Sequence, residues 1–157
     1  MFKFRVIPLI LCVSVMSCTD DSDDSTVIGE NPLSGTSWVS DCTVDDSVPY
    51  DNKYFIKKLM FNESNAITEY IIFETSSCIT SLSQDSLDAP YTLGDIYQTA
   101  SNNKVQDINF TTSVNGEVTG EILNIYKIEN NYLYLGVERD DNLRPIAIDF
   151  NFRYEKQ

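Results

Sequence analysis

The side chains that could perform acid–base or metal chemistry in this 157-residue chain are carboxylates, cysteines and tyrosines, because the sequence contains no histidine. Histidine is the commonest general base and the commonest protein ligand of transition metals. Adjacent carboxylates occur at Asp45-Asp46 and Asp140-Asp141, but neighbours on a strand point to opposite faces and neighbours in a turn usually face water. No nucleophile elbow, phosphate-binding loop or zinc-ligand spacing is present. The sequence therefore predicts a protein that is not an enzyme and that holds no metal ion or cofactor.

One carboxylate and three tyrosines are candidates for lining a ligand cavity, namely Glu69, Tyr126, Tyr132 and Tyr134. Glu69 interrupts an apolar run, and a buried carboxylate there would mark a binding site, although a solvated outer face is the favoured interpretation. Tyr132 and Tyr134 alternate with leucines on one predicted strand, and Tyr126 lies on the strand before it. If the leucines face the interior, the tyrosines form an external aromatic stripe; if not, they line the cavity. The sequence leaves both arrangements open.

The first eighteen residues have the pattern of a secretory signal. Lys3 and Arg5 give a basic start, and the apolar run over residues 6–15 is too short to span a bilayer, which needs about 20 apolar residues. Val15-Met16-Ser17-Cys18 resembles the bacterial lipobox. The resemblance implies that residues 1–17 are a signal peptide and that Cys18 carries a palmitate-type lipid anchor to a membrane. The alternative is a secretory signal without lipidation, in which Cys18 is incidental.

Residues 18–32 are predicted to form a flexible acidic tether, since they combine low hydrophobicity with clustered aspartates. In lipoprotein sorting as known from enterobacteria, aspartate directly after the lipidated cysteine retains the protein in the inner membrane. Thr19 stands at that position, so the resemblance favours the outer membrane. An acidic tract after the cysteine also resembles a surface-export signal, so both faces of the outer membrane stay open.

The mature chain is strongly acidic. Loss of residues 1–17 removes Lys3 and Arg5 from the 11 basic residues, so 9 remain against 24 acidic ones, a formal charge of −15. Nucleic-acid binding needs clustered Lys and Arg against the phosphates, so nucleic acid is excluded as a partner. The remaining chain is long enough for one domain with its own core, residues 33–157.

Cys42 and Cys78 are the two cysteines outside the N-terminal segment. An even pair in a chain exported to an oxidising compartment predicts one disulfide. The two residues are far from Cys-x-x-Cys spacing and no histidine can activate them, which disfavours a redox or nucleophilic role.

From Leu33 onward, apolar residues alternate with period two, as is typical of half-buried strands. The clearest case is 146–154. Asn115-Gly116 between two alternating runs predicts a hairpin turn, followed by a bulge at Gly120. Residues 75–90, rich in Ser, Thr and Asp, are predicted to be a long loop. The predicted strands are 36–44, 54–61, 66–73, 90–99, 108–112, 121–128 (preceded by the run 118–120), 132–138 and 146–154.

Eight consecutive strands with mostly short connections and no amphipathic helix predict an all-β fold, an eight-stranded antiparallel up-and-down barrel. Closing the sheet removes its exposed edges. A barrel of this size encloses either packed side chains or room for one small ligand. A two-sheet β-sandwich is the alternative.

The sequence also resembles a known family. Leu33-Ser34-Gly35-Thr36-Ser37-Trp38 resembles the Gly-x-Trp opening of lipocalins, and residues 38–42, 133–136 and 144–149 are similar to the short lipocalin-like (calycin) domains of bacterial lipoproteins. The resemblance covers residues 33–157. It implies that Trp38 closes the base of the barrel beneath Arg144 or Arg153, through cation–π stacking. It also implies that a cysteine on the first strand pairs with one after the third.

These patterns together predict a lipid-anchored protein of the cell envelope that binds a small apolar ligand without catalysis. The alternative is a structural or protein-interaction β-domain with a packed core. An interior void lined by Tyr, Phe and Ile would favour the first, and a solid core with an exposed apolar patch would favour the second.

Overall fold

The computed structural model describes residues 31–45, 53–139 and 142–157, which belong to one compact unit, Asn31–Gln157. The predicted signal peptide, Cys18 and the tether through Glu30 lie outside the described residues, as do Asp46, Asp140 and Asp141. Within the described ranges the chain is all-β, and none of these residues forms a helix long and apolar enough to cross a bilayer. The strands are β1 (Thr36–Ser40), β2 (Thr43–Asp45), β3 (Lys53–Phe61), β4 (Asn65–Phe73), β5 (Ser81–Gln98), β6 (Lys104–Val114), β7 (Glu117–Glu129), β8 (Tyr132–Gly136) and β9 (Ile148–Lys156).

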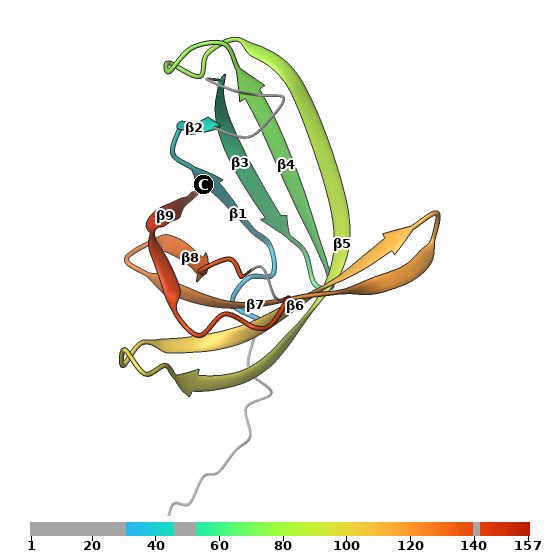
Figure 1. Cartoon of the computed structure of the whole chain (residues 1–157), viewed down its shortest axis with the longest axis vertical. Helices are drawn as coiled ribbons and strands as arrows, with labels where there is room; N and C mark the ends of the chain where they lie inside the picture. Colours follow the sequence, from blue (N-terminus) through green and yellow to red (C-terminus); the bar gives the residue numbers. More distant parts are fainter. Residues whose placement is uncertain (1–30, 46–52, 140–141) are drawn as a thin grey trace, which may run out of the picture. The chain divides into compact units, whose positions relative to one another are not determined.

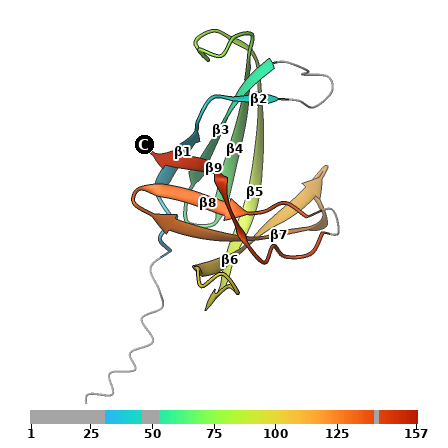
Figure 2. The same ribbon diagram turned by 60° about the vertical axis from the view of Figure 1, so that its left-hand side comes forward.

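The strands form one antiparallel sheet that closes on itself (Figures 1 and 2). From β3 to β9 each strand pairs with the next along the chain, and β1 closes the ring because it pairs with both β9 and β3. Trp38 lies at this closure, opposite Lys156 of β9 and Leu59 of β3. Eight strands therefore make a closed up-and-down barrel, while β2 pairs with β3 alone. The predicted fold class is confirmed, the sandwich alternative is excluded, and the architecture is compatible with a calycin-like fold.

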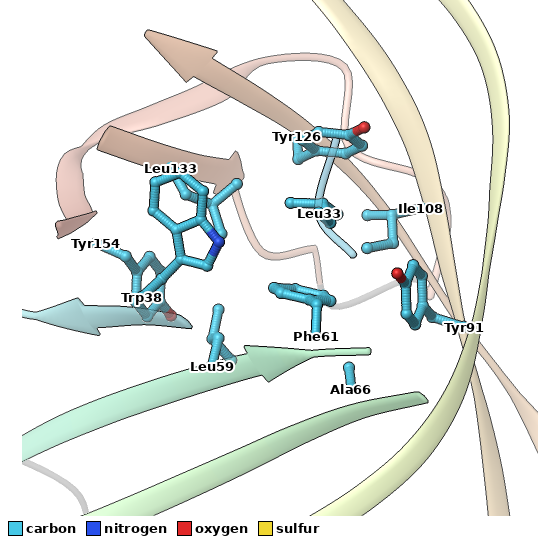
Figure 3. Close-up of a cluster of buried hydrophobic side chains, with 10 residues drawn as sticks. All are labelled: Leu33, Trp38, Leu59, Phe61, Ala66, Tyr91, Ile108, Tyr126, Leu133 and Tyr154. Carbon is cyan, nitrogen blue, oxygen red and sulfur yellow. The ribbon is translucent and has the colours of Figure 1, made fainter. Parts of the chain in front are cut away.

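Figure 3 shows the larger of two buried clusters, which fills one end of the barrel. Its members come from nearly every strand and face one another across the interior. The turn before β1 closes this end, since Leu33 is fully buried and Gly35, at a φ of 71°, donates its N–H to the carbonyl of Phe61 at 2.9 Å. The cluster comprises Leu33, Trp38, Leu59, Phe61, Ala66, Tyr91, Ile108, Tyr126, Leu133 and Tyr154.

A second, smaller cluster lies on the outer face of the sheet. Tyr126 points inward, so the side chain of its neighbour Ile125 points to the outside of the barrel. There Ile125 packs with Val105, Ile148 and Tyr134. The predicted single apolar face of 146–154 is therefore divided between the two sides of the barrel. The register of β8 with β9 shifts at this point, so Ile148 lies outside while Phe152 and Tyr154 lie inside.

The longest strand contradicts one prediction. The sequence predicts a loop over residues 75–90, but Ser81–Pro90 is the first half of β5 and pairs with β4. This half has no apolar alternation because Ser81–Asp88 is exposed throughout, and backbone hydrogen bonds to β4 hold it. The pairing of β5 with β6 begins only at Tyr91, opposite Phe110. In Figure 1 the end of the β6–β7 hairpin accordingly projects away from β5.

Other boundaries follow the predicted turns. Asn115 and Gly116 have φ angles of 53° and 82°, which confirms the hairpin, and the register shifts opposite Gly120, which confirms the bulge. The predicted strand 36–44 is divided into β1 and β2 at residues 41–42.

The Cys42–Cys78 disulfide confirms the predicted pair. It joins the residue just before β2 to the connection between β4 and β5, with the two Cα atoms 6.2 Å apart. The bond ties the edge strand β2 to the far end of the β3–β4 hairpin.

Candidate functional site

The interior of the barrel is only partly filled. Along β3 the core cluster contains Leu59 and Phe61, whereas Phe55 and Lys57 on the same inner face line a cavity of about 540 Å³. The cavity extends to β7, β8, β9 and the β8–β9 connection. Its lining residues are Phe55, Lys57, Glu121, Ile122, Leu123, Asn124, Leu135, Gly136, Glu138, Arg139, Asn142, Leu143, Pro145, Asp149, Phe152 and Tyr154.

The cavity exists because β8 is too short to cover β7. Pairing between them ends at Tyr126 opposite Leu135. Beyond that point the side chain of Asn124 takes the place of the backbone hydrogen bonds between the two strands. Its Oδ1 accepts hydrogen bonds from the N–H of Ile125 at 2.8 Å and from that of Gly136 at 2.9 Å. The first half of β7 thus has no strand on that side, and the β8–β9 connection forms the wall instead.

Gly136 lets that wall pack closely. A Cβ added at this position would lie 2.9 Å from Asn124 Oδ1 and would collide with the ring of Pro145. The connection is also fixed by Arg144, whose Nη1 donates to the carbonyl of Asn124 at 2.7 Å and whose Nη2 donates to Asn109 Oδ1 at 2.8 Å. Arg144 Nε lies 3.3 Å from Asp107 Oδ2. These bonds hold the wall against the barrel.

A lysine surrounded by aromatic rings lies on the inner face. The Nζ atom of Lys57 lies 5.6 Å from the ring centroid of Phe55 and 5.7 Å from those of Tyr70 and Phe152. The three rings come from β3, β4 and β9, and Phe55 stacks on both others, at 4.9 Å from Tyr70 and 5.9 Å from Phe152. Each ring face attracts a cation, so the ammonium group is held at one place in the wall.

Of the predicted cavity residues, Tyr126 faces inward but belongs to the packed end. Its hydroxyl donates to Gln106 Oε1, and burial raises its pKa to about 12. Burial also raises the pKa of Tyr154, which does line the cavity. Both phenols therefore stay protonated at neutral pH, so neither supplies a base to the cavity.

Tyr132 and Tyr134 lie on the outer face, because Leu133 between them is fully buried in the core. Their rings are 6.4 Å apart, and Tyr134 also packs 5.1 Å from Phe150. Of the two arrangements that the sequence allowed, the structure has the external aromatic stripe.

Glu69 also lies on the outer face. It stands opposite Lys58, and its Oε2 is 3.6 Å from Lys58 Nζ. This is the solvated position that the sequence favoured, so Glu69 does not take part in the cavity.

The cation over Trp38 is Lys156, with its Nζ 5.8 Å from the indole ring, in place of the expected arginine. Lys156 is the direct strand partner of Trp38. Arg153 is three residues earlier and lies outside, where it stacks 4.6 Å over Tyr132 and pairs with Asp41 at 3.3 Å. Arg144 instead fixes the β8–β9 connection on the outer face.

Lys57 is not among the residues that the sequence predicts for the cavity. The signal was present, because Phe55, Lys57, Leu59 and Phe61 alternate along one strand and three of the four are apolar. A lysine inserted into an apolar face is a candidate ligand-binding residue once that face is known to be internal.

Among the described residues, no group of three or more Cys, Asp or Glu side chains is placed to hold a metal ion. The cavity instead combines apolar side chains with five charged ones, an arrangement that can bind a small molecule. The charged residues are Lys57, Glu121, Glu138, Arg139 and Asp149. No protein family, curated protein or solved structure matches this chain in the three comparisons made.

Proposed function

We propose that the barrel is a non-catalytic binding protein for one small, largely apolar molecule. The observation that carries the proposal is the interior cavity of about 540 Å³ with Phe55, Ile122, Leu135 and Phe152 in its walls. Ligand sites of drug-sized molecules are typically concave and mostly apolar, with volumes of about 300–1,000 Å³. The packed end of the barrel would serve as the rigid support for this site.

Binding of a neutral fluorescent dye such as Nile red tests the proposal. Ile122→Trp adds volume from a half-exposed position in the cavity wall and should abolish dye binding. Val118→Trp is the matched control, because it lies on the same strand but outside the cavity lining. Native mass spectrometry of protein recovered from cells should also show a retained small molecule. Absence of both dye binding and bound mass would refute the carrier function.

We further propose that the protein is attached to the cell envelope, at the outer membrane, through a lipid on Cys18. The signal-like residues 1–17 and the lipobox-like Val15-Met16-Ser17-Cys18 support this proposal, and the disulfide is typical of exported proteins. Metabolic labelling with a palmitate analogue should mark the protein and fail after Cys18→Ala. No labelling of the unaltered protein would contradict the anchor.

A protein-interaction domain is the second candidate. The observation in its favour is the projecting β6–β7 hairpin, on which Val114 and Val118 are 61% and 71% exposed. Single exposed apolar residues are common on proteins, so the cavity has the greater weight. Partner capture that is lost after Val118→Asp, in a protein that binds no dye, would favour this candidate instead.

A further inference from the structure

We propose that the ligand is an amphipath with one anionic group, and that Lys57 binds that group at the wall of the cavity. The inference rests on the proposed carrier function and adds the chemical class of the ligand. On the inner face, the aromatic rings of Phe55, Tyr70 and Phe152 surround Lys57.

Lys57 differs in its partners from three other lysines that the structure describes. Lys53 lies 2.7 Å from Glu74, Lys58 lies 3.6 Å from Glu69, and Lys127 lies 3.1 Å from Glu129. Over the part of the chain that the structure describes, no carboxylate comes within 4 Å of Lys57 Nζ. Lys104 and Lys156 also form no ion pair with a described residue, but neither of them lines the cavity.

The rings hold the ammonium group without using its hydrogen bonds. Cation–π attraction acts through the ring faces, whereas an ammonium has three N–H donors. These donors remain for solvent or for a ligand oxygen at the cavity wall. A carboxylate or phosphate oxygen is the strongest acceptor that a small ligand can offer, because the hydrogen bond is then charged on both sides.

The apolar part of the cavity wall favours an apolar ligand body. Ile122, Leu135 and Phe152 line it together with the aromatic group around Lys57. Arg139 is a second cation in the lining. Glu121, Glu138 and Asp149 also line the cavity and repel an anion. An anionic group is therefore attracted near Lys57 and repelled near these carboxylates. This difference fixes the orientation of an elongated ligand.

Calorimetry with matched ten-carbon ligands tests the inference. The protein is the chain from residue 18 onward with Cys18→Ser, which lacks both the signal-like apolar run and the proposed lipid site and so allows measurement without detergent. Decanoate and decyl phosphate should bind about 10-fold or more tightly than decan-1-ol, since a hydrogen bond between charged groups is worth about that factor. The two anions separate a carboxylate from a phosphate preference.

Variants of two adjacent lysines supply the controls. Lys57→Met should remove the preference for the anions and leave decan-1-ol affinity within about 2-fold, while Lys57→Arg should retain the preference. Lys58→Met changes the neighbouring outer-face lysine and should leave all affinities unchanged. Circular dichroism of each variant establishes that the barrel is folded.

The outcomes separate the inference from the carrier function. Equal binding of acid and alcohol, unaffected by Lys57→Met, would overturn the role of Lys57 and leave the carrier function in place. Tighter binding of decyltrimethylammonium than of decanoate would also overturn it, because the carboxylates would then select the ligand. Failure of every ligand and of Nile red to bind would refute the carrier function itself.

Discussion

Removal of the disulfide should destabilise the barrel by an amount that follows from its position in the chain. Cys42 and Cys78 are separated by 36 residues, and a cross-link closing a loop of this length lowers the entropy of the unfolded chain by the equivalent of about 4 kcal/mol at 25 °C. The entropy of unfolding for a unit of the size of Asn31–Gln157 is about 0.27 kcal/mol/K. The double variant Cys42→Ser/Cys78→Ser should therefore melt roughly 15 °C lower than the unaltered protein.

Thermal unfolding followed by far-ultraviolet circular dichroism, with and without a thiol reductant, is the assay. Reduction of the unaltered protein should lower its Tm to that of the double-serine variant, and reductant should not change the Tm of the variant. If the oxidised protein and the variant melt within about 3 °C of each other, the cross-link does not restrict the unfolded chain as argued. If reductant lowers the Tm of the variant as well, the reductant destabilises the protein by a route other than reduction of this disulfide.

Three further predictions concern the stability of the barrel. Leu133→Ala, at a fully buried position, should lower the free energy of unfolding measured in urea by about 2–5 kcal/mol. Val118→Ala, at the exposed hairpin, should change it by less than about 0.5 kcal/mol. Equal effects of the two substitutions would contradict the assigned core. The folded pKa of Tyr126 is about 12, above its ordinary value of 10.0, so its contribution to stability is complete below pH 10 and is lost as the pH rises toward 12. Unfolding measured from pH 8 to 11.5 should show a smaller alkaline loss for Tyr126→Phe, and an unchanged slope would argue against burial of this phenol. Gly116→Ala, at a φ of 82°, should lower the free energy of unfolding by about 1 kcal/mol. Gly120→Ala should lower it less, because the added Cβ would meet only Thr112 Oγ1, at 3.5 Å. The reverse order would contradict the turn geometry.

The regular parts of the fold were predictable because they depend on local patterns. Alternation of apolar residues marked most strands, and Asn115-Gly116 marked the hairpin since both residues adopt positive φ. The strand Ser81–Asp88 was not predictable in this way. Both of its faces are exposed, so its conformation comes from hydrogen bonds to β4 and leaves no apolar pattern in the sequence.

The sequence predicted a cavity only indirectly, because a barrel of eight strands can enclose room for a small ligand. The sequence pattern allowed either a closed barrel or a sandwich. What makes this sheet a closed barrel is that β1 pairs with both β9 and β3. The cavity also depends on the short β8 and on Asn124, whose side chain ends the β7–β8 ladder. Neither feature has a signature in the periodicity, because each arises where strands distant in sequence stop pairing.

The sequence by itself determined that the chain is all-β, where most of its turns lie, and which two cysteines form the disulfide. Only the tertiary structure decided which side of each strand is internal. Tyr132 and Tyr134 lie outside and Lys57 lies inside, although all three occupy alternating strands. The physical reason is that alternation defines two faces but not their orientation, which is set when β1 closes the sheet and one face becomes the interior.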